Sequence, residues 1–134
     1  MTLAVGQSAT RQLTLTAEHV RKYSEISGDY NPLHYDESFA AATRFGRLVA
    51  QGGITSGMLN ALVAMDLPGP GTVFVSQTLR YLAPTYLGDT LTAEVEVLAV
   101  KPDKPVCQLK ATITNQDGTA VLEGECWTYT LRPK

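Results

Sequence analysis

The segment that most constrains the fold of this chain is an apolar stretch, residues 54–65, with the length and spacing of a buried helix. Small residues separate its large apolar side chains, which are Ile54, Met58, Leu59, Leu62, Val63 and Met65. Gly52-Gly53 precede the stretch and Pro68 follows it, which marks where the helix should begin and end. Because such a helix is apolar on most sides, we expect other elements to enclose it.

The second half of the chain has the pattern of strands that could enclose this helix. Apolar and polar residues alternate in residues 90–97 and 107–114, as in half-buried antiparallel strands. Residues 72–82 and 119–131 predict two more long strands. The sequence therefore predicts a single α+β domain over residues 1–134, in which an antiparallel β-sheet wraps around a central apolar α-helix.

The last hairpin carries both cysteines of the chain, and apolar pairing suggests its register. If Ile113 faces Ala120, Cys107 faces Cys126 and small or apolar pairs fall on one face of the hairpin. The cytosol keeps thiols reduced, and buried free cysteine is a common core residue. We therefore expect two reduced thiols in the core and no disulfide.

Composition and charge narrow the class of protein. Hydrophobic residues make up 44% of the chain and charged residues 18%, which is typical of a globular protein. The formal net charge of −2 provides no basic surface, so we expect no nucleic-acid partner. Two histidines and two widely separated cysteines predict no metal site. No apolar run spans a bilayer and the N-terminus lacks an export pattern, so we expect a cytoplasmic location.

The first half of the chain reads as helical after a short strand at residues 11–15. A helix is expected between the N-cap residue Thr16 and the terminator Gly28. Between them, apolar residues recur at helical spacing: Val20, Tyr23 and Ile26. A short helix should follow, with Asp36 as its N-cap and Phe39 as its buried anchor.

The loop between these two helices, residues 29–34, carries the best candidates for chemistry. Asp29 and His34 are general acid/base types, and histidine has an unperturbed pKa near ~6.5, so it exchanges protons at neutral pH. Asn31 lies between them, and Pro32 restrains the backbone. The simpler alternative is a turn aspartate and a surface histidine.

Gly52-Gly53 supply a second candidate feature at the start of the apolar helix. The first N–H groups of a helix have no intrahelical partner, and the helix dipole is positive there. Glycine lets a ligand approach this backbone closely, so an acyl carbonyl could be polarised there as in an oxyanion hole. The alternative is a tight loop without a ligand.

A resemblance to a known family rests on this loop and its flanks. The chain closely resembles the hydratase 2 motif of MaoC-like enzymes through Ser27-Gly28-Asp29-Tyr30-Asn31-Pro32-Leu33-His34. The resemblance continues through Asp36, Phe39-Ala40, Thr43-Arg44-Phe45, Gln51-Gly52, Leu67-Pro68-Gly69, Pro84 and Gly88-Asp89-Thr90. In length and layout the chain is similar to the single-domain (R)-specific enoyl-CoA hydratases, the type that feeds polyhydroxyalkanoate synthesis.

The resemblance implies a fold, a reaction and a set of site residues. The fold is the hot-dog fold, and family members usually pair as homodimers with an acyl-CoA tunnel near the interface. The reaction is reversible hydration of trans-2-enoyl-CoA to (R)-3-hydroxyacyl-CoA. Asp29 and His34 match the catalytic pair, Asn31 the residue that orients it, and Gly52 the glycine whose N–H binds the thioester oxygen. No metal or redox cofactor is implied, since CoA belongs to the substrate.

Three departures from the family pattern leave the substrate open, and two alternative functions remain. Gln51 stands where relatives often have histidine, Gly53 where methionine is common, and Asn60 where serine often occurs. One alternative keeps the fold but makes the chain a thioesterase or a 3-hydroxyacyl-carrier-protein dehydratase. The other is a non-catalytic acyl-CoA-binding subunit. Acyl chain length and the thiol carrier remain open, and three arginines are candidate phosphate partners: Arg44, Arg47 and Arg80.

Overall fold

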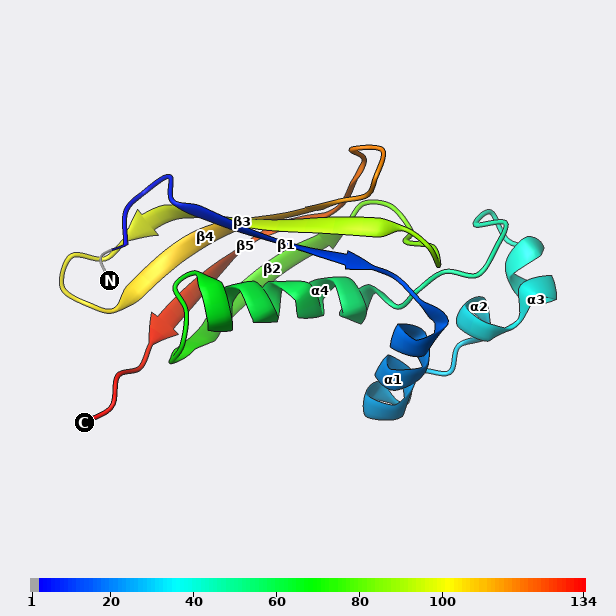
Figure 1. Ribbon diagram of the computed structural model, residues 1–134, viewed down its shortest axis with the longest axis horizontal. Helices are drawn as coiled ribbons and strands as arrows, with labels where there is room; N and C mark the ends of the chain where they lie inside the picture. The colour runs from blue at the N-terminus through cyan, green and yellow to red at the C-terminus, as the bar shows by residue number, and fades with distance from the viewer. Residues whose placement is uncertain (1–2) are drawn as a thin grey trace.

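The computed structural model describes residues 3–134, which form one antiparallel sheet with a helix along one of its faces (Figure 1). The strands are β1 (Ser8–Thr14), β2 (Thr72–Tyr81), β3 (Thr90–Val100), β4 (Val106–Thr114) and β5 (Ala120–Thr130). Their order in the sheet is β1-β3-β4-β5-β2, and every neighbouring pair is antiparallel. β1 and β2 are therefore the edge strands.

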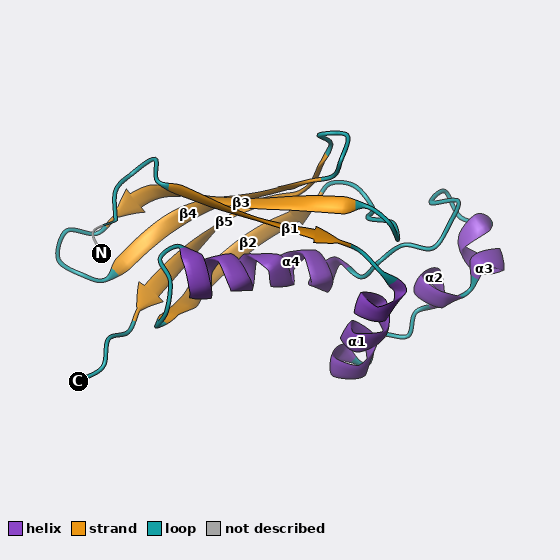
Figure 2. Ribbon diagram, viewed as in Figure 1, coloured by secondary structure: helices purple, strands orange, loops and turns teal. Residues whose placement is uncertain are grey.

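The apolar segment forms α4 (Gly52–Ala61), which a π-helical turn, η1 (Leu62–Asp66), continues. Figure 2 shows this helix lying along the sheet, and its side chains Leu59, Leu62 and Val63 are buried against the inner face. The predicted α+β architecture is confirmed. The sheet covers one side of the helix, however, and Met65, expected in the core, lies exposed on the other side.

The β4–β5 hairpin does not have the expected register. Cys107 lies opposite Thr128 and not opposite Cys126, a shift of two residues. A β-bulge beside Ile113 leaves Val121 as an extra residue on β5, which accounts for one residue of the shift. The turn accounts for the other, because Thr114 pairs with Ala120 and not with Thr119. Both registers keep the same side chains on the inner face because they differ by an even number of residues, so alternation could not separate them. Both cysteines are buried and free, as expected.

Three helices lie together beyond the end of the sheet at which α4 begins (Figure 2). They are α1 (Ala17–Ser27), α2 (Pro32–Tyr35) and α3 (Glu37–Ala41). Thr16 caps α1 as predicted, and its partner in the capping box is the side chain of His19. Gly28 ends α1 with a left-handed φ of 80°, which glycine adopts readily.

Two burial predictions for these helices are wrong. Ile26 is 84% exposed, because the face of α1 that packs against the rest of the chain carries Val20 and Ser24 instead. Phe39 is also exposed, and the small Ala40 occupies the inward position of α3. Within residues 3–134, no helix has the length and apolar character needed to cross a membrane.

Candidate active site

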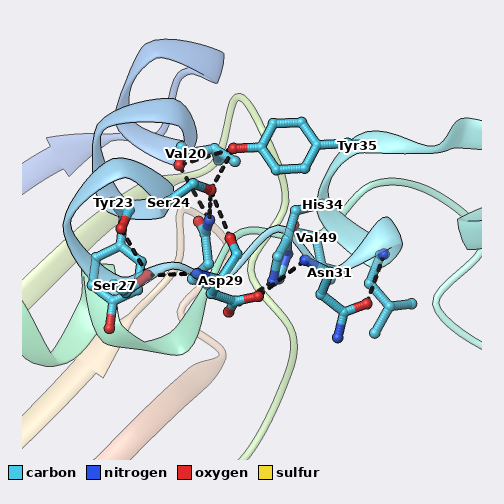
Figure 3. A network of polar contacts seen from close by, with 11 residues as sticks. Val20, Tyr23, Ser24, Ser27, Asp29, Asn31, His34, Tyr35 and Val49 are labelled. Atoms are coloured by element: carbon cyan, nitrogen blue, oxygen red, sulfur yellow. Dashed lines mark hydrogen bonds and ion pairs between the residues drawn. The ribbon is translucent and has the colours of Figure 1, made fainter.

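The loop between α1 and α2 brings Asp29 and His34 into contact (Figure 3). Asp29 Oδ2 lies 3.3 Å from His34 Nε2. The imidazole is only 8% exposed, whereas the carboxylate is partly open to solvent. Asp36 caps α3 by accepting a hydrogen bond from the Phe39 N–H at 3.0 Å, as expected, which holds the chain just after His34. The two residues therefore form a dyad with one buried and one accessible member.

The other ring nitrogen of His34 fixes the tautomer of the imidazole. Nδ1 lies 2.7 Å from the backbone oxygen of Val49, and a carbonyl oxygen only accepts hydrogen bonds. Nδ1 therefore carries a proton and donates it to Val49. Nε2 is left as the nitrogen that gains or releases a proton, and it is this atom that faces Asp29.

Hydrogen bonds on three sides hold Asp29. Its N–H donates to Ser27 Oγ at 3.1 Å, and its backbone oxygen accepts from Ser24 Oγ at 2.7 Å. Its Oδ1 accepts from the backbone N–H of Asn31 at 3.1 Å. The side chain of Asn31 is used differently, because its Oδ1 caps α2 by accepting from the Leu33 N–H at 3.0 Å. Asn31 thus orients Asp29 through its backbone and fixes the start of the helix that carries His34.

Gly52 is the first residue of α4, at the end of the helix nearest to α1 (Figure 1). The N-cap residue, Gln51, gives α4 no side-chain cap, so the N–H groups of the first turn lack that partner. A Cβ on Gly52 would lie 2.8 Å from a ring carbon of Tyr81, which covers this position. Gly52 and Tyr81 line a cavity of about 300 Å³, and Val49, the hydrogen-bond partner of His34, lines it as well.

Gly53 lies under a second tyrosine. A Cβ on Gly53 would be 1.7 Å from the hydroxyl oxygen of Tyr23, so the phenol fills the space that a side chain would need. The first two residues of α4 are therefore both glycines beneath aromatic rings. This packing accounts for Gly53, one of the three departures from the usual family pattern.

Sequence reasoning missed a buried cluster beside the dyad. Gln51 Nε2 donates to Ser24 Oγ at 2.9 Å and to the backbone oxygen of Val20 at 3.1 Å. The hydroxyl of Tyr35 also contacts Ser24 Oγ. One signal was available, because Ser24 follows Val20 by four residues and therefore lies on the same buried face of α1. The contact with Gln51, 27 residues away, has no local signal.

The three candidate phosphate-binding arginines have different surroundings. Arg44 lines the cavity beside Gly52, with its guanidinium 5.5 Å from the centre of the Phe45 ring. Arg47 stacks 4.0 Å above the ring of Tyr86. Arg80 pairs with Glu123 at an exposed position on β2. Of the three, only Arg44 lines the cavity that contains Gly52.

Comparison with known proteins assigns the chain to a family. The MaoC like domain family matches residues 3–121, and the chain belongs to this family. The chain is 38% identical over 123 residues to the (R)-specific enoyl-CoA hydratase of Aeromonas caviae, covering 92% of each sequence. It is 39% identical over 123 residues to the 3-hydroxybutyryl-CoA dehydratase of Methylorubrum extorquens, covering 92% of this chain and 78% of the relative.

A solved structure supports the same assignment. An (R)-hydratase from A. caviae involved in PHA biosynthesis superimposes with a TM-score of 0.93 at 36% identity, over 97% of this chain and 98% of that chain. The antiparallel sheet with its central helix is the hot-dog fold that the resemblance predicted. These relatives are hydratases and dehydratases, that is, hydro-lyases.

Proposed function

We propose that this protein is an (R)-specific enoyl-CoA hydratase, which adds water reversibly to trans-2-enoyl-CoA to give (R)-3-hydroxyacyl-CoA. One observation carries the proposal: a His–Asp dyad with a contact of 3.3 Å is connected through Ser24 and Gln51 to a helix whose first two residues are glycines. Relatives of the same length and fold that act as (R)-specific hydratases support it.

The dyad would activate the water. Asp29 Oδ2 and His34 Nε2 face each other, and both accept a hydrogen bond when the imidazole is neutral. A water molecule beside the pair can donate one hydrogen to each. The water oxygen adds to C3 of the enoyl group while one of its protons passes to the dyad. A proton from the dyad reaches C2 on the same face, so one molecule of water is added overall.

The start of α4 would stabilise the charge that develops on the thioester oxygen. The Gly52 N–H lies at the positive end of the helix dipole and has no side-chain cap competing for the first turn. Attack at C3 pushes electrons onto the thioester oxygen, and this N–H would donate a hydrogen bond to that oxygen. The mechanism requires no metal or redox cofactor, because proton transfer and an amide donor supply each step.

Hydration of crotonyl-CoA, followed by loss of the enoyl absorbance with chiral analysis of the product, tests this function. We expect (R)-3-hydroxybutyryl-CoA from the wild-type protein. Asp29→Asn and His34→Ala should each reduce kcat at least ~100-fold, the usual scale for loss of a general acid/base. His19→Ala is the matched control, since this histidine caps α1 away from the dyad. Wild-type protein without hydration activity, or dyad variants with unchanged turnover, would contradict the proposal.

Two further assays with the same preparation identify the type of reaction and the thiol carrier. Release of free thiol from crotonyl-CoA would indicate thioester hydrolysis and contradict the proposal. Equal turnover of crotonyl-CoA and a crotonyl carrier protein would show that the carrier is not selected. We expect the CoA thioester to be preferred, and a series of enoyl-CoA lengths would define the acyl range.

A homodimer is the second part of the proposal, and the exposed edge of β2 supports it. Val73 and Val75 are both exposed, Val75 by 63%, because residues two apart on a strand share a face and Phe74 between them packs against the core. An apolar edge strand with free backbone groups is a template for pairing with another chain. A second copy that pairs along β2 would extend the sheet and cover these side chains.

Light scattering coupled to size exclusion tests the assembly. We expect a dimer, and we expect Val75→Lys to give a monomer because it places a charge on the paired edge. Val5→Lys is the matched control, since Val5 is equally exposed but precedes β1. A monomeric wild-type protein would contradict the dimer. The cytoplasmic location stays a prediction, which fractionation of the native organism would test.

A further inference from the structure

Two buried side chains and the hydroxyl of an exposed tyrosine connect the dyad loop to the start of α4. They are Ser24 of α1, Tyr35 of α2 and Gln51, the residue before Gly52. We propose that these three residues form a positioning cluster, which fixes the distance between Asp29 and the Gly52 amide. This inference rests on the proposed hydration and deepens it, by assigning residues that act through Asp29 without touching the substrate.

The hydroxyl of Ser24 is the centre of the positioning cluster (Figure 3). It is 0% exposed, and it donates its only proton to the backbone oxygen of Asp29 at 2.7 Å. Its two lone pairs receive Gln51 Nε2 and the Tyr35 hydroxyl. A serine hydroxyl offers one donor and two acceptor positions, so its capacity is fully used. A displacement of Asp29 would leave the buried Ser24 hydroxyl without its acceptor, which is costly.

The side chain of Gln51 forms hydrogen bonds in the positioning cluster and does not cap α4, the helix that it precedes. Both N–H groups of the amide are used, on Ser24 and on Val20, and only the NH₂ end can serve the Val20 carbonyl. The other end, Oε1, is buried without a hydrogen-bond partner, and the residue is 2% exposed. An apolar side chain of equal length would avoid this unpaired acceptor, so the donors are what the amide contributes here.

The covalent chain completes the connection from Asp29 to the oxyanion donor. Gln51 precedes Gly52 directly, and Ser24 Oγ bridges the Gln51 amide to the Asp29 carbonyl through two hydrogen bonds. The acid/base group and the N–H that polarises the thioester therefore share one buried bridge. Reacting groups misplaced by about 1 Å can lose roughly 10²-fold in rate. The bridge is thus a direct determinant of kcat.

Two substitutions test the positioning cluster, and both should fold. Ser24→Ala removes the central hydroxyl, and Gln51→Met keeps the side-chain length while it removes the donors and the unpaired acceptor. We expect kcat for crotonyl-CoA to fall about 10- to 100-fold in each, with KM changed less than about threefold. Thr128→Val is the matched control, because Thr128 is also 0% exposed and hydrogen-bonds Cys107, but lies on β5. It should lower Tm and leave kcat unchanged.

A double-mutant cycle separates positioning from general damage to the fold. If Ser24 acts through Asp29, Ser24→Ala should reduce kcat no further in an Asp29→Asn background. Losses that multiply in the double variant would overturn the inference. So would folded Ser24→Ala and Gln51→Met proteins that keep wild-type kcat.

A measurement that does not depend on turnover tests the positioning cluster separately from the proposed reaction. The ¹⁵N resonance of His34 Nε2 reports the neighbouring Asp29 carboxylate in the ligand-free protein. We expect it to move in Ser24→Ala and Gln51→Met but not in Thr128→Val. Unmoved resonances would overturn the positioning cluster even if hydration is confirmed. Moved resonances in a protein that does not hydrate crotonyl-CoA would instead overturn the proposed reaction.

Discussion

The phenol of Tyr23 occupies the space above Gly53, so that a Cβ at position 53 would lie 1.7 Å from the tyrosine hydroxyl oxygen. The two residues come from different helices, α1 and α4, and are 30 positions apart in the sequence. A side chain at position 53 and a tyrosine at position 23 therefore exclude each other. Gly53 and Tyr23 are therefore a matched pair, in which the small residue makes room for the large one.

This pairing predicts coupled effects on stability. Gly53→Ala should displace the Tyr23 ring and lower the free energy of unfolding by about 1–3 kcal/mol, the scale of overpacking. In a Tyr23→Ala background the same substitution should cost much less, because the space is then free. Urea unfolding of both single variants and the double variant measures the coupling. Strictly additive losses would contradict the pairing.

A side chain at Gly124 on β5 should cause a larger loss of stability, because the atom nearest to it belongs to the backbone. A Cβ there would lie 2.0 Å from the carbonyl oxygen of Thr78 on β2, which a rotamer change cannot move away. Gly124→Ala should therefore destabilise the fold by about 3 kcal/mol, at the upper end for overpacking. Thermal and urea unfolding measure this loss.

Gly57 provides the matched control for Gly124. It lies inside α4, and no heavy atom from outside its own helical backbone would come within 4 Å of an added Cβ. Gly57→Ala should raise the free energy of unfolding by up to about 1 kcal/mol, because alanine favours the helix. Equal losses in the two variants would show that backbone contact at Gly124 does not matter.

The ion pair between Arg11 and Asp66 predicts a pH dependence of stability. Arg11 Nε donates to Asp66 Oδ2 at 2.6 Å, which ties β1 to the end of η1. This hydrogen bond and the guanidinium charge hold the pKa of the Asp66 carboxyl below its ordinary value. The unfolded chain therefore takes up the proton first as the pH falls. The stabilisation is complete above the ordinary value of about 3.9 and disappears below it.

Thermal unfolding between about pH 5 and pH 3 tests the role of Asp66. The wild-type Tm should fall more steeply with decreasing pH than the Tm of Asp66→Asn. Added salt should reduce the difference, because the pair is partly exposed. Parallel curves at low salt would show that the ion pair contributes nothing to folding.

The buried cysteines predict thiols that are inert in the folded protein. Burial, together with the neighbouring Cys107, raises the pKa of Cys126 to about 12, and burial also raises the pKa of Cys107. Both stay protonated at pH 8, and the thiolate is the reactive form. A disulfide reagent should label neither residue in buffer and both in denaturant. Rapid labelling of the native protein would contradict their burial.

The extent to which sequence predicts this fold depends on the range of each interaction. The alternation in β3 and β4 and the apolar run of α4 are local patterns, and they sufficed for the architecture. Ile26 and Phe39 were misjudged because periodicity identifies an apolar residue but not whether another element covers it. The hairpin register depended on a bulge beside Ile113, for which the sequence contains no separate signal.

The candidate site likewise contains local contacts, which the sequence predicts, and long-range contacts, which it does not. Asp29 and His34 lie within six residues, so a short turn is enough to bring them together, and the structure does so. The approach of Tyr23 to Gly53, and of Gln51 to Ser24, requires α1 to pack against the start of α4. Contacts of this kind follow from tertiary packing, and no pattern in one sequence defines them.

The missing side-chain cap at the start of α4 has a consequence for how this protein can be improved. Serine or aspartate at position 51 would cap the helix, and such caps are commonly worth about 1 kcal/mol. The side-chain oxygen at position 51 would accept hydrogen bonds from N–H groups of the first turn, and an aspartate would also repel a developing enolate. Either substitution would also remove the amide donors that Gln51 gives to Ser24 and Val20, and a buried polar group left without its partner costs roughly 1–3 kcal/mol. Stability and turnover therefore both retain glutamine at position 51, and selection of variants for heat resistance alone should leave the start of α4 uncapped.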